Sequence, residues 1–319
     1  MILSRLLSGV DPLVRLLLLA IALATFVPVT GEARGAAQAV SNSAVFLLFL
    51  LNGLRLPRAE VRRGLTNLRF LLPLVIWCFG VMGLAGWGIS ALAGGVVPAE
   101  VALGLLFLGV LPSTVQSATA YSSLAGGNVA ASVVAAAVIN ILGVFISAPL
   151  FSLLAGSAAA PFDSDALERV ATILLLPFAL GQVAQGWIGH FVREHRQLAS
   201  WMDRTSIAIA VYVAFSGAVE QGLWGKVDMQ GWLVLLALVG LFLLVGFGGS
   251  WGLGGSLRLG RPERIAFLFA GAQKSIALGA PLASVLFPPA LAGLLLLPVL
   301  TYHLLQLVVS APLAARLSR

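Results

Sequence analysis

Long apolar stretches dominate this sequence and limit the folds that it can adopt. A membrane-spanning helix needs about 20 mostly apolar residues, and ten such stretches can be placed along the 319 residues. Their predicted limits are 12–29, 36–54, 69–92, 99–122, 128–154, 167–189, 203–221, 230–255, 265–287 and 290–313. Because a chain in lipid must satisfy its own backbone hydrogen bonds, we expect all ten to be helices. The sequence therefore predicts an all-α membrane protein with ten transmembrane helices.

The charged residues predict the orientation of these helices. Only 10% of the residues are charged, against about a quarter in soluble domains, and the net charge is +7. If the N-terminus is cytoplasmic, 15 of the 19 basic residues fall on the inner side, all but Arg34, Arg169, Lys226 and Lys274. An excess of Lys and Arg marks cytoplasmic loops. We therefore expect both termini in the cytoplasm, membrane lipids as partners, and no nucleic acid.

The chain divides near its midpoint into two halves that resemble each other in organisation. The stretch from Ala155 to Asp165 is small and acidic, as expected of a linker, and the predicted halves are 1–157 and 166–319. Five spans per half make the second half enter the membrane from the opposite side, so the halves are predicted to be inverted repeats. The fourth span of each half is interrupted by polar residues, Gly and Pro, in PSTVQSATAYSS from Pro112 and FAGAQKSIALGAP from Phe269. Paired interruptions of this kind predict a transporter binding site between broken helices.

Lys274 is the most informative single residue. It lies in the middle of a predicted span, where an ammonium group is costly and normally has a function or a partner. Where a membrane helix breaks, its last carbonyls lose their intrahelical partners and carry about half a negative elementary charge. We expect the Lys274 ammonium to neutralise these carbonyls as a covalently tethered cation. The alternative is a lysine that snorkels to the membrane interface.

Neutral polar side chains in the same stretches are candidates for binding the substrate or an ion. The predicted substrate- and ion-binding residues are Ser113, Thr114, Gln116, Ser117, Thr119, Asn128, Ser132, Gln273, Lys274 and Ser275. About half of the polar residues in the first interrupted span would serve only close helix packing. Asn128 has an equal alternative as a helix N-cap after Gly126 and Gly127. His303, in the last span, is either a proton relay or a buried, hydrogen-bonded histidine.

Three segments of the sequence point to a known family. They are LPSTVQSATAYSSLAGGNVAASVV from Leu111, NILGVFISAPL from Asn140 and GAQKSIALGAPLASVLF from Gly271. These segments resemble the bile acid:sodium symporter family. The resemblance is strongest to its SBF-like branch, which includes bacterial membrane proteins and the seventh member of the eukaryotic bile-acid carriers. It implies a bacterial inner-membrane carrier of a small organic anion. It also implies a panel domain of spans 1, 2, 6 and 7, and a core domain of spans 3–5 and 8–10 in which broken spans 4 and 9 cross.

The sodium ligands that the resemblance implies are largely replaced. At positions where the bile-acid branch has sodium ligands or conserved polar residues, this chain has others. Phe269 replaces a Glu, Lys274 replaces an Asn, Ala118 and Thr119 replace a Ser-Asn pair, and Ala136 replaces a Thr. Gln273 and Ser132 match the family and form the predicted residual sodium site. We hypothesise that Lys274 replaces the bound cation and leaves a sodium-independent or proton-coupled carrier. No cofactor is expected, apart from Na⁺ or H⁺ as the coupling ion.

Two other functions remain as alternatives. A cation/proton antiporter of related architecture would need carboxylates at the crossing, and no Asp or Glu falls well inside a predicted span. A non-transporting regulator or scaffold could use the basic inner face to bind a partner. An enzyme is not expected, because the sequence has no intramembrane Asp pair, metal-ligand spacing or nucleophile elbow.

Overall fold

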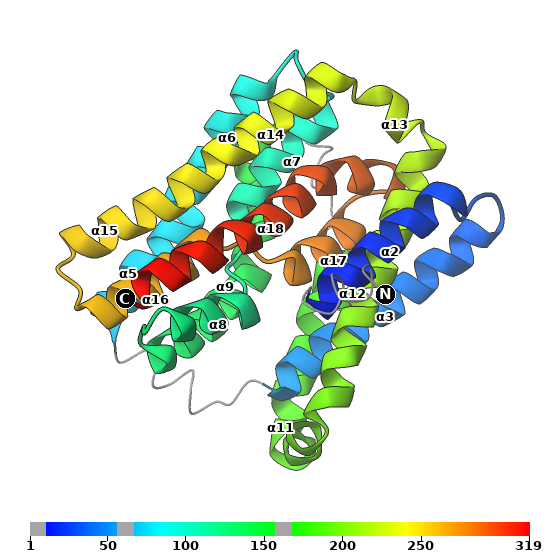
Figure 1. The fold of residues 1–319 in the computed structure, drawn as a ribbon. Coiled ribbons are helices and arrows are strands. Elements are labelled where there is room, and N and C mark those ends of the chain that lie inside the picture. Colours follow the sequence, from blue (N-terminus) through cyan, green and yellow to red (C-terminus); the bar gives the residue numbers. More distant parts are fainter. Residues whose placement is uncertain (1–10, 56–66, 157–167) are drawn as a thin grey trace, which may run out of the picture. The chain divides into compact units, whose positions relative to one another are not determined.

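The chain is built almost entirely of helices (Figure 1). A computed structural model describes residues 11–55, 67–156 and 168–319, and the only β-pairing among them is an isolated bridge between Gly94 and Val97. The prediction of an all-α protein is therefore confirmed. Most of the predicted linker from Ala155 to Asp165 lies outside the described residues.

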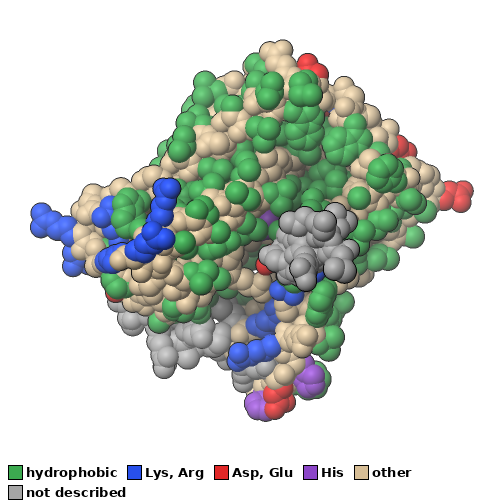
Figure 2. All heavy atoms as spheres, viewed as in Figure 1, with side chains coloured by type: hydrophobic (Ala, Val, Ile, Leu, Met, Phe, Trp, Pro, Cys, Tyr) green, Lys and Arg blue, Asp and Glu red, His purple; other side chains and the backbone are tan. Residues whose placement is uncertain are grey.

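Seven of the described helical segments are long and apolar enough to cross a membrane. They are Ala33–Arg55, Leu68–Ala93, Val129–Ala155, Glu168–Val192, Met229–Ser256, Arg261–Leu286 and Pro289–Leu317. Exposed leucine, valine and phenylalanine side chains are numerous, and Figure 2 shows hydrophobic side chains over much of the visible surface. Lipid is the solvent that such a surface requires. The protein is therefore an integral membrane protein.

The other three predicted spans are helical but do not meet this standard by length and composition. The stretch 12–29 forms a helix of only 15 residues. The stretch 99–122 is broken into two short helices. The stretch 203–221 belongs to a longer helix, Arg196–Glu220, whose first turns include Asp203 and Arg204. The ten-span count therefore stays a prediction.

The described chain forms two compact units. Unit 1 contains residues 11–55, 168–226 and 280–294. Its helices are α2 (Pro12–Phe26), α3 (Ala33–Arg55), η3 (Ala171–Leu175, a π-helical turn), α11 (Leu176–Glu194), α12 (Arg196–Glu220) and α13 (Leu223–Lys226). The backbones of α3 and α11 touch, since a Cβ on Gly181 would lie 2.3 Å from the Leu50 carbonyl oxygen. Ion pairs join Arg34 to Glu220 and Arg55 to Asp203.

Unit 2 contains residues 67–156, 227–279 and 295–319. Its helices are α5 (Leu68–Val75), η1 (Ile76–Val81, π-helical), α6 (Met82–Ala93), α7 (Ala99–Val110), α8 (Gln116–Leu124), α9 (Val129–Ala155), α14 (Met229–Leu244), η4 (Val245–Gly249, π-helical), α15 (Ser250–Ser256) and α16 (Arg261–Ala272). Helices α17 (Ile276–Leu286) and α18 (Pro289–Leu317) have residues in both units.

Small residues let the helices of unit 2 approach one another closely. A Cβ on Gly86 of α6 would lie 2.9 Å from the Cα of Gly109 on α7. On another face of α7, a Cβ on Gly104 would lie 2.4 Å from the Leu295 carbonyl oxygen of α18. Close backbone approach through small residues is typical of packing between membrane helices. It holds α7, whose end forms part of the candidate site, between α6 and α18.

Both polar stretches interrupt their helices, as the sequence predicts (Figure 1). Helix α7 ends at Val110 and α8 begins at Gln116, while α16 ends at Ala272 and α17 begins at Ile276. Leu111 is extended, with φ −71° and ψ 147°, because the following Pro112 disfavours the α conformation at the residue before it. Gln273 is also extended, with φ −81° and ψ 143°.

Candidate functional site

The two breaks meet within unit 2. The Ser275 backbone N–H donates a hydrogen bond of 2.9 Å to the Pro112 carbonyl oxygen. We call the two broken segments, 111–115 and 273–275, the crossing. Two helices, α7 and α16, end there, and two others, α8 and α17, begin there. Backbone carbonyl and N–H groups that have no partner within their own helix are therefore concentrated in one place.

The Lys274 side chain lies at the centre of this arrangement and is only 1% exposed. Its Nζ donates to three carbonyl oxygens, those of Cys78 at 2.9 Å, Gly109 at 2.8 Å and Leu111 at 2.8 Å. An ammonium group has three N–H donors, so each proton has an acceptor. Two of these acceptors belong to the end of α7 and the third to the π-helical turn η1. The snorkelling alternative is therefore wrong, and the ammonium sits where the sequence predicts a tethered cation.

Every carbonyl from residue 109, near the end of α7, to residue 113, in the first break, has a partner beyond its own helix. Besides the two that bind Lys274 and the one that binds Ser275, the Val110 oxygen accepts from Ser147 Oγ at 2.8 Å and the Ser113 oxygen accepts from Asn140 Nδ2 at 2.8 Å. Buried backbone polar groups are rarely left unpaired. The side chains of α9 and Lys274 thus replace the helical bonds that the break removes.

Side chains also satisfy the backbone of the second break. The Gly271 oxygen accepts from Trp77 Nε1 at 3.1 Å, and the Ala272 oxygen accepts from Tyr302 Oη at 2.5 Å. Gln306 binds the main chain of Lys274 twice: its Oε1 accepts from the Lys274 N–H at 2.8 Å, and its Nε2 donates to the Lys274 oxygen at 3.0 Å. Both α16 and α17 are therefore held at the break by residues of η1 and α18.

A second polar cluster is built around Gln273, the residue before Lys274. Thr114 Oγ1 and Ser117 Oγ are each 2.6 Å from Gln273 Oε1, and Gln273 Nε2 donates to Ser310 Oγ at 3.0 Å. Thr114 Oγ1 also accepts from the Ala118 N–H at 3.2 Å, in the first turn of α8. The structure thus brings together three of the predicted site residues, Thr114, Ser117 and Gln273, in one hydrogen-bonded cluster, and Gln273 precedes Lys274 in the chain.

The remaining predicted residues occupy several environments. Ser113 is buried at the first break, and Gln116 is exposed at the start of α8. Ser275 Oγ accepts from the Leu278 N–H at 3.3 Å in the first turn of α17. The buried hydroxyls of Thr119 and Ser132 have no hydrogen-bond partner in the described part of the chain. Gln273 is hydrogen-bonded to Ser117 of α8 and Ser310 of α18, and the residual sodium site of Ser132 and Gln273 stays a prediction.

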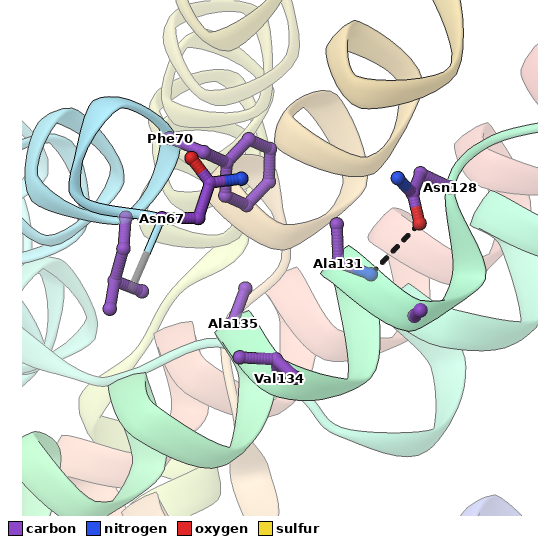
Figure 3. A pocket seen from close by; sticks show the side chains of 8 residues that line it. Asn67, Phe70, Asn128, Ala131, Val134 and Ala135 are labelled. Atoms are coloured by element: carbon purple, nitrogen blue, oxygen red, sulfur yellow. Dashed lines mark hydrogen bonds between the residues drawn. The ribbon is translucent and has the colours of Figure 1, made fainter. Parts of the chain in front are cut away.

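Asn128 caps a helix, as its alternative interpretation predicts. Its Oδ1 accepts from the Ala131 N–H at 3.0 Å at the start of α9, and its Nδ2 donates to Glu263 at 3.1 Å. It also lines a separate cavity of about 260 Å³ between the beginnings of α5 and α9 (Figure 3). The lining residues are Asn67, Phe70, Leu71, Asn128, Ala130, Ala131, Val134 and Ala135, so the cavity contains no residue of the crossing.

Three residues of α18 were not among the predicted site residues. Tyr302, Gln306 and Ser310 all bond to the segment 272–274. They are four residues apart along a mostly apolar helix, and side chains at this spacing share one helix face. That polar stripe is the sequence signal that would have found them. His303, the predicted proton relay, joins the network through a 2.9 Å contact between its Nδ1 and Gln306 Nε2.

Removing the Tyr302 hydroxyl tests how much one of these bonds stabilises the break. We expect Tyr302→Phe to lower the free energy of unfolding by about 1–3 kcal/mol, because the buried Ala272 carbonyl loses its donor. Tyr212→Phe is the matched control, since Tyr212 Oη also donates to a carbonyl, that of Val27 at 2.9 Å, at a partly exposed position. Thermal unfolding of both variants in detergent gives the comparison. Equal losses would contradict a special role for the buried bond.

Comparison with known proteins identifies the family. A profile of the SBF-like CPA transporter family matches residues 11–319. An uncharacterized protein of Pseudomonas aeruginosa is 37% identical over 307 residues, which are 95% of this chain and 91% of that protein. The "Putative symporter YfeH" of Escherichia coli (strain K12) is 33% identical over 97% of this chain and 93% of its own length. The mouse protein named sodium/bile acid cotransporter 7 is 25% identical over 86% of this chain and 82% of its own length. With its long apolar helices and paired breaks, the chain belongs to the SBF-like CPA transporter family.

Proposed function

We propose that the protein is a secondary active transporter that moves a small organic anion across the bacterial inner membrane by alternating access. In this proposal ten membrane-spanning helices form two inverted repeats, with both termini in the cytoplasm. The two breaks support it, because they fall in the fourth predicted span of each half. In this proposal unit 2, which holds both breaks, supplies most of the core, and unit 1 contains the panel together with residues 280–294 of predicted spans 9 and 10.

The observation that carries the proposal is the set of three hydrogen bonds that the Lys274 ammonium donates to backbone carbonyls. Its positive charge offsets the partial negative charge of the carbonyls at the end of α7. The N-terminal ends of α8 and α17 then add their partial positive charge at the same crossing, which favours an anionic substrate. Gln116 is exposed and Ser117 partly exposed at the start of α8, whereas Lys274 is buried. We infer that α8 contacts the anion, and that Lys274 sets the charge of the site without contacting the anion.

The same geometry supports a carrier that does not need sodium. A bound cation at a helix crossing would be coordinated by carbonyl oxygens, and three carbonyls here are already bonded to Lys274 Nζ. Phe269 occupies the position that holds Glu in the bile-acid branch and supplies no carboxylate. Its ring centroid lies 5.9 Å from that of Tyr121. The name of the mouse relative refers to sodium, so this chain would differ from that relative in its coupling ion.

Thermal unfolding in sodium and in choline chloride tests this part of the proposal. A ligand that binds only the folded state at 100 times its Kd stabilises that state by about 2.7 kcal/mol. We expect the melting temperature of the purified protein to be the same in both salts at equal ionic strength. A rise specific to sodium would show that a sodium site survives despite Phe269 and Lys274.

Substrate screening then tests transport itself. Small carboxylates and sulfonates, taurocholate included, are compared for their effect on the melting temperature, and the anion with the largest effect is used for uptake into proteoliposomes. Uptake without sodium is the expected result. If uptake of that anion has a strict sodium requirement, the tethered-cation proposal is wrong, and if no tested anion is bound or taken up, the transport proposal loses its support.

A further inference from the structure

The main chain of Lys274 fixes the orientation of the Gln306 side-chain amide. A backbone N–H can only donate and a backbone carbonyl can only accept. Gln306 Oε1 must therefore face the Lys274 N–H, 2.8 Å away, and Gln306 Nε2 must face the Lys274 oxygen, 3.0 Å away. We call this pair of hydrogen bonds the clamp. It closes on the central residue of the second break, and the Gln306 side chain is fully buried.

The clamp in turn determines where neutral His303 carries its proton. Gln306 Nε2 lies 2.9 Å from His303 Nδ1. Because Nε2 is an amide donor in this orientation, Nδ1 must accept, and a neutral imidazole has one donor and one acceptor nitrogen. The proton of neutral His303 therefore belongs on its Nε2. This tautomer follows from the two backbone contacts of Gln306.

A second proton on His303 is incompatible with the clamp. Both ring nitrogens of an imidazolium are donors, so the Nδ1–H would point at the Gln306 NH₂ group. Turning the amide over would give Nδ1–H an acceptor. That rotation would also place the NH₂ group against the Lys274 N–H and the amide oxygen against the Lys274 carbonyl, so both bonds of the clamp would be lost. Buried polar groups without partners are costly, so the break would have to rearrange.

We propose that His303 is a proton-binding site and that Gln306 is a positioning residue. When His303 binds a second proton, Gln306 loses its two hydrogen bonds to the Lys274 main chain, and the second break can then rearrange. The proposal rests on the transport function proposed above, and it makes H⁺ the coupling ion.

The other buried ionisable groups in the described part of unit 2 are Cys78 on η1, Lys274 in the crossing and Tyr302 on α18, while α8 contributes the half-buried Tyr121. No Asp or Glu is buried among the described residues. A proton on His303 thus adds positive charge where Lys274 is already present, which also favours rearrangement.

The tautomer of His303 is the first test. The sequence has three histidines, and His190 and His195 are exposed, so ¹⁵N-histidine NMR of the full chain in detergent or lipid gives few signals and His303→Gln assigns the one of interest. At a pH where His303 is neutral, we expect its proton on Nε2. A proton on Nδ1 would overturn the proposal. This measurement uses the wild-type protein and so does not depend on the folding of any variant at Gln306.

The coupling between His303 and the second break is the second test. Backbone amide hydrogen exchange of the segment 273–275 is measured as the pH falls through the titration of His303 and is corrected for the intrinsic pH dependence of exchange. In the wild type we expect exchange to increase by about tenfold or more, as the loss of two buried hydrogen bonds would give. The corrected rates should be independent of pH in His303→Gln and in Gln306→Met, and His195→Gln should behave like the wild type.

These results separate the inference from the proposed transport function. A pH-dependent increase that persists in Gln306→Met would show that the proton does not act through the clamp, and its absence from the wild type would remove the switch altogether. Neither outcome bears on whether an anion is transported, because neither test uses a substrate. Conversely, failure of every anion in the uptake assay would defeat the transport proposal while leaving the measured link between His303 and Lys274 intact.

Discussion

Replacing Lys274 with Met will abolish transport and lower the free energy of unfolding by at least about 3 kcal/mol. Hydrogen bonds to charged groups contribute about 1.5–3 kcal/mol each, and three carbonyl oxygens would lose such a bond. Part of this loss is offset because the buried ammonium no longer has to be desolvated. The methionine side chain has a similar shape, so the loss reports the charge and its bonds. Thermal unfolding and proteoliposome uptake measure the two effects.

The chain offers a close control for this substitution. Its two lysines are Lys274 and Lys226, and Lys226 is exposed at the end of α13. Lys226→Met should therefore melt and transport like the wild type. Lys274→Arg keeps the charge, but a planar guanidinium cannot direct three donors from one atom, so we expect intermediate stability and low transport. A Lys274→Met protein with normal stability and uptake would contradict the role of the tethered cation.

The breaks were predictable from the sequence because their causes are local. Pro112 has no backbone N–H to donate and restricts the residue before it, and three polar residues in succession, Gln273 to Ser275, interrupt an apolar span. The helical cap at Asn128 has an equally local origin in the preceding glycines. The number of complete spans was less predictable. Hydropathy does not show that the first helix ends after 15 residues, or how a helix with charged residues in its first turns, such as α12, is accommodated.

The partners of the crossing were not predictable in the same way. Cys78, which provides a carbonyl to Lys274, lies in the π-helical turn η1. Such turns leave no distinct sequence pattern, although they are common at functional sites. Gln306 and Tyr302 come from more than 25 residues further along the chain, and their bonds to the second break span 32 and 30 residues. Their spacing marks a polar helix face, but only the packing of α18 shows which backbone groups that face meets.

Adding one methyl group at Gly86 should destabilise unit 2. The new Cβ of Gly86→Ala would lie 2.9 Å from the Gly109 Cα and 2.9 Å from the Leu105 oxygen. These neighbours are backbone atoms of α7 and cannot move aside individually, so α6 and α7 must separate. Overpacking of this kind costs about 1–3 kcal/mol. It would also shift the Gly109 carbonyl, which binds Lys274.

Gly88→Ala, two residues along the same helix, is the matched control. A Cβ at Gly88 meets nothing within 4 Å, and alanine has a higher helix propensity than glycine. The control should therefore be as stable as the wild type or slightly more stable, whereas Gly86→Ala should melt at a lower temperature and show faster amide exchange in the first break, residues 111–115. Because both variants make the same chemical change in α6, their difference isolates the contact with α7. If the two variants proved equally stable, the close approach of α6 and α7 would not be what holds the Gly109 carbonyl against Lys274.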